Sequence, residues 1–330
     1  MAQFGTVFCD HMAIARFENG GWGKPAIEPL APLSLHPASH VFHYASTCFE
    51  GFKAYRWPDG KAHIFRLRDH IARMQRSAKS LHLPVPDADL LAGMVEDLVR
   101  EQLDDIPQPP SSLYLRPTLI GTLPNIGAAA APSTQATLFV LASPVGDYFA
   151  GGARPLKLLV TDTISRSTEQ LGSTKTGGNY AAALGPTLAA KAEYGVDQVL
   201  FCPGGDVQET GAANFLLLND EEIITKPLNS SFLHGMTRAS ILTLAKDLGY
   251  RVNERNFTVA ELLDWVAGYE AALSGTAATL TPVGRLVYEG REILVRDGGT
   301  GPNTVKLRKA LQAIQYGDAP DTHGWLTEVS

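Results

Sequence analysis

The chain of 330 residues is 45% hydrophobic and 19% charged and carries a formal net charge of −6. This composition is typical of a globular protein, the length predicts two domains, and the lack of a basic block argues against a nucleic-acid partner. Cys9, Cys48 and Cys202 are far apart and form no Cys-x-x-Cys motif, so we expect neither a disulfide framework nor a metal site. The first residues lack a secretory signal, and no apolar run is long enough to span a bilayer. We therefore expect a soluble, cytoplasmic protein.

The first half of the sequence predicts short strands and then two helices. Extended segments are expected at 30–36, 40–44, 49–55 and 62–65, with a Pro-Asp-Gly turn before the last. A helical apolar stripe predicts a helix over 67–81, and another helix follows Asp87. Strands are expected at 113–120 and 136–141. Residues 143–152 are typical of a linker, which divides the chain into a domain at 1–146, a linker at 147–153 and a domain at 154–330.

The second half predicts more strands, separated by helices. Strands are expected at 156–160, 198–202, 215–218, 270–274 and 277–283. Helices are expected at 180–194, 237–248 and 305–316, each with a glycine directly after it as a natural stop. Thr258 and Glu261 match a capping box that opens one further helix. The pattern indicates a two-domain α/β protein.

The segment from Gly172 to Tyr180 draws attention because it places one lysine, Lys175, among small and polar residues before a helix. Gly177 and Gly178 allow a close backbone approach. A lysine kept neutral by its surroundings becomes a nucleophile that forms Schiff bases with carbonyl compounds. The ordinary alternative is a solvated lysine in a glycine-rich surface loop.

An aldehyde cofactor of the pyridoxal phosphate kind would need several partners besides the lysine. Its phosphate requires an arginine or helix N-terminal amides, and its ring nitrogen requires a carboxylate. Arg66 and the helix start at Met236 and Thr237 are candidates for the phosphate, and Glu209 is a candidate for the nitrogen. Each also has an ordinary explanation: a surface arginine, a helix cap and a solvated carboxylate. Residues alone leave these alternatives open.

Taken together, these segments resemble the branched-chain amino acid aminotransferases, which are fold-type IV pyridoxal phosphate enzymes. The resemblance covers nearly the whole chain, in the order of the family. Its specific parts are Lys-x-Gly-Gly-Asn-Tyr at 175–180 and Tyr-x-Arg-Pro-Thr-Leu-Ile-Gly at 114–121; Phe-Glu-Gly at 49–51 and Gly-Thr-Ala at 275–277 add to it. It implies a smaller N-terminal α/β domain, a larger C-terminal pseudo-barrel domain with the cofactor between them, and a homodimer.

The resemblance also implies a role for each matching residue. Lys175 would hold the cofactor covalently, Glu209 would pair with the ring nitrogen and Tyr180 with the ring oxygen. Arg66, Met236, Thr237 and Thr276 would hold the phosphate, and Thr276 and Ala277 the substrate α-carboxylate. An aromatic pocket would take the branched side chain, and Arg116 would receive the distal carboxylate of glutamate. The pocket residues are Phe8, Tyr44, Phe49, Tyr114 and Tyr148.

The chain departs from the mammalian-type branch of the family at two places. A Cys-x-x-Cys follows the Gly-Thr-Ala turn in that branch, whereas this chain has Ala-Thr-Leu-Thr at 278–281. A thiol redox switch of that kind is therefore not expected. That branch also has a threonine where this chain has Ala212, so a hydroxyl near the cofactor is missing.

The expected reaction is reversible amino transfer between leucine, isoleucine or valine and 2-oxoglutarate. Within the fold, the rivals are a D-amino acid aminotransferase and an aminodeoxychorismate lyase. The long Tyr-x-Arg-Pro match argues against both. A rival of another class is a non-catalytic protein that only binds the cofactor. Retention of Tyr114 and Arg116 together with Lys175 and Glu209 disfavours it.

Overall fold

A computed structural model of the chain describes residues 4–127, 130–146 and 154–330. The chain forms two compact units. The first comprises Met1–Asp147, Thr174–Gly177 and Ile314–Ser330, and the second comprises Tyr148–Ser173 and Gly178–Ala313. The predicted linker at 147–153 lies outside the described residues, so those domain limits stay a prediction. The grouping of 174–177 and 314–330 with the N-terminal unit was not predicted.

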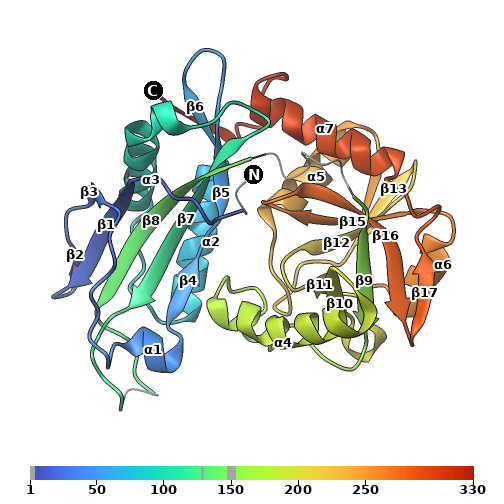
Figure 1. Cartoon of the computed structure of the whole chain (residues 1–330), viewed down its shortest axis with the longest axis horizontal. Helices are drawn as coiled ribbons and strands as arrows, with labels where there is room; N and C mark the ends of the chain where they lie inside the picture. Colours follow the sequence, from blue (N-terminus) through green and yellow to red (C-terminus); the bar gives the residue numbers. More distant parts are fainter. Residues whose placement is uncertain (1–3, 128–129, 147–153) are drawn as a thin grey trace. The chain divides into compact units, whose positions relative to one another are not determined.

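The first unit is built on one antiparallel sheet (Figure 1), whose central strands run in the order β18-β6-β5-β7-β8-β1-β2, with β3 on β1 and β4 on β7. Its strands are β1 (His11–Glu18), β2 (Gly21–Trp22), β3 (Ala26–Pro29), β4 (Thr47–Phe49), β5 (Phe52–Arg56), β6 (Ala62–Phe65), β7 (Ser112–Gly121), β8 (Ala136–Val145) and β18 (Leu326–Val329).

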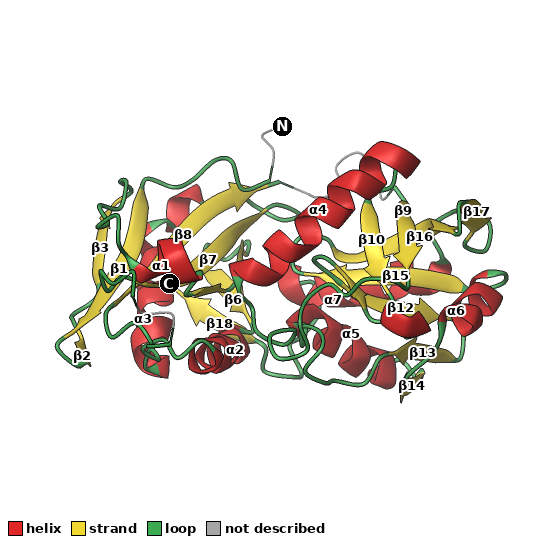
Figure 2. Ribbon diagram, turned by 90° about the horizontal axis from the view of Figure 1, so that it is seen from below, coloured by secondary structure: helices red, strands yellow, loops and turns green. Residues whose placement is uncertain are grey.

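Two amphipathic helices, α2 (Leu67–Ser80) and α3 (Ala88–Glu101), lie side by side on one face of this sheet (Figures 1 and 2). The predicted stripe of α2 is buried: Leu67, Ile71, Met74 and Ala78 are at most 2% exposed. The Asp87 carboxylate caps α3 by accepting from two backbone amides. Removal of these apolar side chains from water drives the packing of helices on sheet.

Three predictions in this unit are wrong. Residues 30–36 form no strand: β3 ends at Pro29, and Pro32 and Pro37 have no amide hydrogen to donate to a neighbouring strand. Residues 40–44 are not extended but form the short helix α1 (His40–Tyr44), which Ala45 ends in a left-handed conformation. Ser143 and Pro144 do not belong to a linker, because β8 continues through them and pairs with the start of β7. The predicted segment at 49–55 is divided into β4 and β5 by Glu50 and Gly51.

The second unit is built on a mixed sheet that closes on itself. Its strands run in the order β11-β10-β9-β16-β15-β12-β13-β14, and an additional β11–β12 pairing joins the two sides, as the predicted pseudo-barrel requires. The strands are β9 (Leu156–Thr161), β10 (Gln198–Phe201), β11 (Glu209–Thr210), β12 (Asn214–Leu218), β13 (Glu222–Thr225), β14 (Arg251–Glu254), β15 (Glu270–Gly275), β16 (Thr279–Tyr288) and β17 (Arg291–Leu294).

The helices of the second half are α4 (Gly177–Tyr194), α5 (Met236–Asp247), α6 (Val259–Val266) and α7 (Pro302–Tyr316). Gly195, Gly249 and Gly317 follow three of them with positive φ, which confirms the predicted stops. The capping box at Thr258 and Glu261 is also confirmed. No helix among the described residues is both long enough and apolar enough to cross a membrane.

Candidate active site

The backbone of Lys175 is fixed within the first unit on both sides. Its amide donates to Ser77 Oγ of α2 at 3.0 Å, and its carbonyl accepts from the Phe49 amide at 3.0 Å. The next residue, Thr176, donates its hydroxyl to the Thr47 carbonyl and forms a bridge with Cys48. The predicted lysine therefore lies in a rigid segment beside β4 rather than in a solvated loop.

Phe49 brings three of the predicted site residues together. Lys175 Nζ lies 5.0 Å from the centroid of the Phe49 ring, and the Arg116 guanidinium carbon lies 4.7 Å from it. Arg116 also donates to the Tyr114 hydroxyl at 2.8 Å. Gly51 makes room for that hydroxyl, since a Cβ at position 51 would lie 2.0 Å from it. The first unit thus has an aromatic wall with an amine and a guanidinium beside it.

A buried ion cluster supports this wall from α2. Arg73 donates to both oxygens of the Glu50 carboxylate at 2.7 and 2.8 Å, and His70 Nδ1 lies 2.7 Å from the second oxygen. Burial tends to raise the pKa of Glu50, but the charges and hydrogen bonds of Arg73 and His70 outweigh it and hold this pKa well below its usual value. Burial lowers the pKa of His70, and the charges of Arg73 and Lys175 lower it further against the opposing charge of Glu50.

The other predicted pocket residues are Phe8, Tyr44 and Tyr148. Tyr44 ends α1, where its hydroxyl donates to the Ile126 carbonyl and its ring contacts His40. Phe8 is 44% exposed. Phe4, which was not predicted, packs edge-on against Tyr114 with ring centroids 4.9 Å apart. Tyr148 lies outside the described residues, so its role stays a prediction.

Arg66 lies in the first unit, at the junction of β6 and α2, as the sequence predicts. Its side chain is only 13% exposed, and it forms an ion pair with Asp69, with 2.6 Å between Nε and Oδ2. Asp69 belongs to the first turn of α2 and is itself about half exposed. The alternative of a solvated surface arginine is therefore excluded, and the role of Arg66 toward a phosphate stays a prediction.

Glu209 is the centre of a polar cluster in the second unit. Its carboxylate is 3% exposed and pairs with Arg166, with 2.6 Å between Oε1 and Nε. It also accepts from the Leu233 amide and from Asn214 Nδ2, both at 3.0 Å. An ion pair and two further donors therefore orient this carboxylate, and the alternative of a solvated glutamate is excluded.

The strand register places further polar groups next to Glu209. Glu209 pairs with Asn214 across β11 and β12, and Asn214 pairs with Ser274 across β12 and β15. The Ser274 hydroxyl is buried and has no hydrogen-bond partner among the described residues, which is unusual for a buried polar group. Asn214 also contacts the segment before α5, because a Cβ on Gly235 would lie 2.0 Å from Asn214 Oδ1.

These features fit a ligand with an anionic group and a polar ring. Helix α5 starts at Met236, and its N-cap residue, Gly235, has no side chain with which to cap the first amides. Such a helix start is a favourable site for a phosphate. The unpartnered Ser274 hydroxyl and the oriented Glu209 carboxylate are independent signs of a polar ligand in this unit.

The remaining predicted residues lie in loops and helix ends of the second unit. Thr237 is in the first turn of α5, and Tyr180 is in the first turn of α4. Thr276 and Ala277 form the turn between β15 and β16. This turn lies beside the bend at Ala212, whose carbonyl would be 3.7 Å from a Cβ on Gly275.

Sequence reasoning missed Arg166 and Ser77. Arg166 is an isolated arginine in a polar stretch, and no spacing relates it to Glu209, which lies far along the chain. Ser77 could have been found, because it lies with His70 and Arg73 at helical spacing on α2. Three polar residues on the buried side of an amphipathic helix indicate polar partners in the core.

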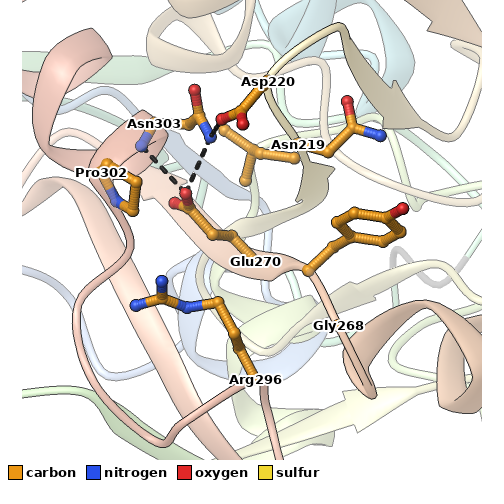
Figure 3. A pocket seen from close by; sticks show the side chains of 9 residues that line it. Asn219, Asp220, Gly268, Glu270, Arg296, Pro302 and Asn303 are labelled. Atoms are coloured by element: carbon orange, nitrogen blue, oxygen red, sulfur yellow. Dashed lines mark hydrogen bonds between the residues drawn. The ribbon is translucent and has the colours of Figure 1, made fainter.

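A pocket of about 180 Å³ at the start of α7 is a different kind of feature (Figure 3). The Glu270 carboxylate accepts from the amides of Asn303 and Thr304 and from both of their side chains. Figure 3 shows Asn303 between Asp220 and Glu270, and its side-chain amide donates to both. These groups satisfy one another, so the cluster is a buried helix cap.

Comparisons with known proteins identify the family of this chain. The family model "Amino-transferase class IV" matches residues 47–286. The chain is 38% identical to a probable branched-chain-amino-acid aminotransferase of Streptomyces coelicolor, over 98% of this chain and 91% of that protein. It is 39% identical to the mitochondrial branched-chain-amino-acid aminotransferase of Mus musculus, over 99% and 86% of the two chains.

Solved structures agree as well. The T.th. branched-chain amino acid aminotransferase with pyridoxamine 5'-phosphate superposes with a TM-score of 0.82 at 27% identity, covering 98% of this chain and 99% of that chain. The Escherichia coli branched-chain amino acid aminotransferase gives a TM-score of 0.76 at 28% identity, covering 97% and 99%. The chain therefore belongs to the class IV aminotransferases, in the group of the branched-chain amino acid aminotransferases.

Proposed function

We propose that this protein transfers the amino group of leucine, isoleucine or valine to 2-oxoglutarate, with pyridoxal phosphate as its cofactor. The observation that carries the proposal is that the Phe49 ring is contacted by both Lys175 and Arg116. A reactive amine and a carboxylate receptor on one aromatic wall suit a pocket that takes an apolar side chain and, alternately, a carboxylate. Full-length similarity to the Streptomyces and Mus proteins supports the same activity.

In this proposal the first unit supplies the reacting amine and the specificity. Lys175 attaches the cofactor and moves the α-proton as general base and then general acid. Phe49 and Tyr114 contact the branched side chain, with Phe8 and Tyr44 completing the wall. Arg116 binds the distal carboxylate of glutamate, because its guanidinium offers a planar fork of donors. A leucine side chain is shorter and apolar, and it does not reach this group.

The second unit holds the ring and the phosphate. Pyridoxal phosphate supplies an aldehyde for the substrate amine and a ring that withdraws electrons when its nitrogen is protonated. Glu209, oriented by Arg166, favours that protonated nitrogen. Tyr180 binds the ring oxygen, and Met236, Thr237 and Thr276 bind the phosphate together with Arg66. Thr276 and Ala277 orient the substrate α-carboxylate. A homodimer is expected from the resemblance alone and stays a prediction.

The test is a substrate panel with the purified full-length chain. L-leucine, L-isoleucine and L-valine should each convert 2-oxoglutarate to L-glutamate, and should each change the absorbance of the bound cofactor in single-turnover experiments. Turnover of D-alanine in place of the L-amino acids would favour a D-amino acid aminotransferase. Pyruvate release from aminodeoxychorismate would favour the lyase, and a bound cofactor that no amine changes would indicate a non-catalytic binding protein.

A further inference from the structure

Arg66 has an unusual backbone conformation for a residue with a side chain. Its φ is +56° and its ψ is 39°, in the left-handed region, which L-residues other than glycine rarely adopt. Hydrogen bonds on both sides maintain this conformation: the Arg66 amide donates to the Trp325 carbonyl at 2.6 Å, and the Arg66 carbonyl accepts from the His70 amide at 3.1 Å. A residue held in this way directs its side chain differently from one in an ordinary helix start.

The Arg66 side chain is also held in place by the same tryptophan. Its guanidinium carbon lies 5.4 Å from the centroid of the Trp325 ring, within the range of a cation–π contact. Asp69 contacts Nε from the first turn of α2. Trp325 therefore contacts Arg66 twice, through its carbonyl and through its indole face.

Trp325 in turn is rigidly placed by residues near the end of the chain. The His323 ring stacks on it with centroids 4.5 Å apart, and the Phe65 ring meets it edge-on at 5.7 Å. Directly after it, β18 pairs with β6 in the sheet, and the Leu326 amide donates to Asp321 at 2.7 Å. Trp325 is only 9% exposed. The position of this indole is therefore set by folding and does not wait for a ligand.

We propose that Trp325 is a positioning residue for the cofactor phosphate, which it serves by fixing the Arg66 guanidinium. This inference rests on the proposed function, in which Arg66 binds that phosphate. An arginine side chain loses considerable rotamer freedom when it binds an anion. Where an aromatic face and a fixed backbone have already restricted the side chain, this loss is smaller on binding and the affinity is higher. Residues 321–326 thus support the proposed phosphate site through Arg66, although the sequence places them far from it.

The proposal is tested by comparing two ligands that differ only in the phosphate. The full-length chain, freed of cofactor with hydroxylamine, is titrated with pyridoxal phosphate and with pyridoxal, and the Kd of each is read from absorbance. In Trp325→Leu the Kd for pyridoxal phosphate should rise about tenfold, while that for pyridoxal changes less than about twofold. Trp325→Phe keeps an aromatic face and should restore most of the affinity.

Trp22→Leu is the matched control. Trp22 lies in β2 of the sheet that contains β18, and it packs on Phe17 rather than on Arg66. The control variant should leave the ratio of the two Kd values unchanged. If Trp325→Leu does not fold, as judged by thermal melting, the ratio is measured on Trp325→Met, which also lacks a ring. An unchanged ratio in the folded variant, whether both Kd values rise together or neither does, overturns the proposal. Failure of the wild-type chain to bind pyridoxal phosphate would instead overturn the proposed function.

Discussion

Replacement of Arg116 by alanine should separate the two kinds of substrate. Arg116 Nη2 donates to the Tyr114 hydroxyl, the guanidinium lies over the Phe49 ring, and its buried Nε has no hydrogen-bond partner among the described residues. A carboxylate that enters beside Phe49 would complete this set of hydrogen bonds. In Arg116→Ala, glutamate loses a charge-assisted contact, whereas leucine loses only an apolar neighbour.

The size of the effect follows from the kind of contact that is lost. Truncation of one partner of a buried, hydrogen-bonded charge pair costs about 2 to 4 kcal/mol, which corresponds to a fall of roughly 30- to 1,000-fold in kcat/KM for glutamate. For leucine the variant loses only the contact between the Arg116 guanidinium and the Phe49 ring. Its kcat/KM should therefore stay within about fivefold of the wild-type value.

The assay is the single-turnover reaction of the cofactor-loaded enzyme with L-glutamate and, separately, with L-leucine, followed by absorbance. Arg16→Ala removes an exposed arginine from β1 of the same sheet and is the control. Arg116→Lys should be intermediate, because lysine keeps the charge but not the planar fork. Equal losses for glutamate and leucine in Arg116→Ala would refute the reasoning.

Three further predictions concern the buried ionic groups. Arg73→Met leaves the Glu50 carboxylate buried without its bidentate partner and should lower the free energy of unfolding in urea by about 3 to 5 kcal/mol; a change below about 1 kcal/mol would contradict the role of this pair. The pKa of His70 is lower in the folded chain than the ordinary value of 6.5, so its contribution to stability is complete above that pH and is lost as the pH falls through the folded pKa. In His70→Asn the free energy of unfolding should therefore fall less between about pH 7 and pH 5 than in the wild type. If urea melts at several pH values show the same dependence of this free energy on pH in both proteins, the prediction is wrong. Glu209→Gln replaces the carboxylate opposite Arg166 by a neutral amide of similar shape. Cofactor absorbance should persist and leucine turnover should fall roughly hundredfold, and full activity would exclude Glu209 as the partner of the ring nitrogen.

Among the described residues, local patterns in the sequence were sufficient for every α-helix except α1 and for many of the strands. The stripe from Leu67 to Ala78 specifies α2, and the capping box at Thr258 specifies the start of α6. In these cases the interacting groups lie within a few residues of one another, so the information is local. The motifs around Lys175 and Arg116 identified the family for the same reason: each is a short, contiguous run.

Contacts with residues outside the segment decided the structure of two segments that local patterns mispredicted. Ser143 and Pro144 have the composition of a linker, but β7 offers them paired positions and they continue β8. The helix at His40 depends on contacts outside its own residues, including a bond of 2.9 Å between His40 and Ser46. Propensity is a weak prior that such contacts override.

The sequence by itself determined the family and, through it, which lysine and which other residues we propose for the site. Only the tertiary structure decided how the charged residues are paired: Arg73 with Glu50, Arg166 with Glu209 and Trp325 on Arg66. The physical reason is that a buried charge requires a partner, but many partners along the chain would satisfy that requirement equally well. Which of them is within reach depends on strand order and register, and these are properties of the whole fold.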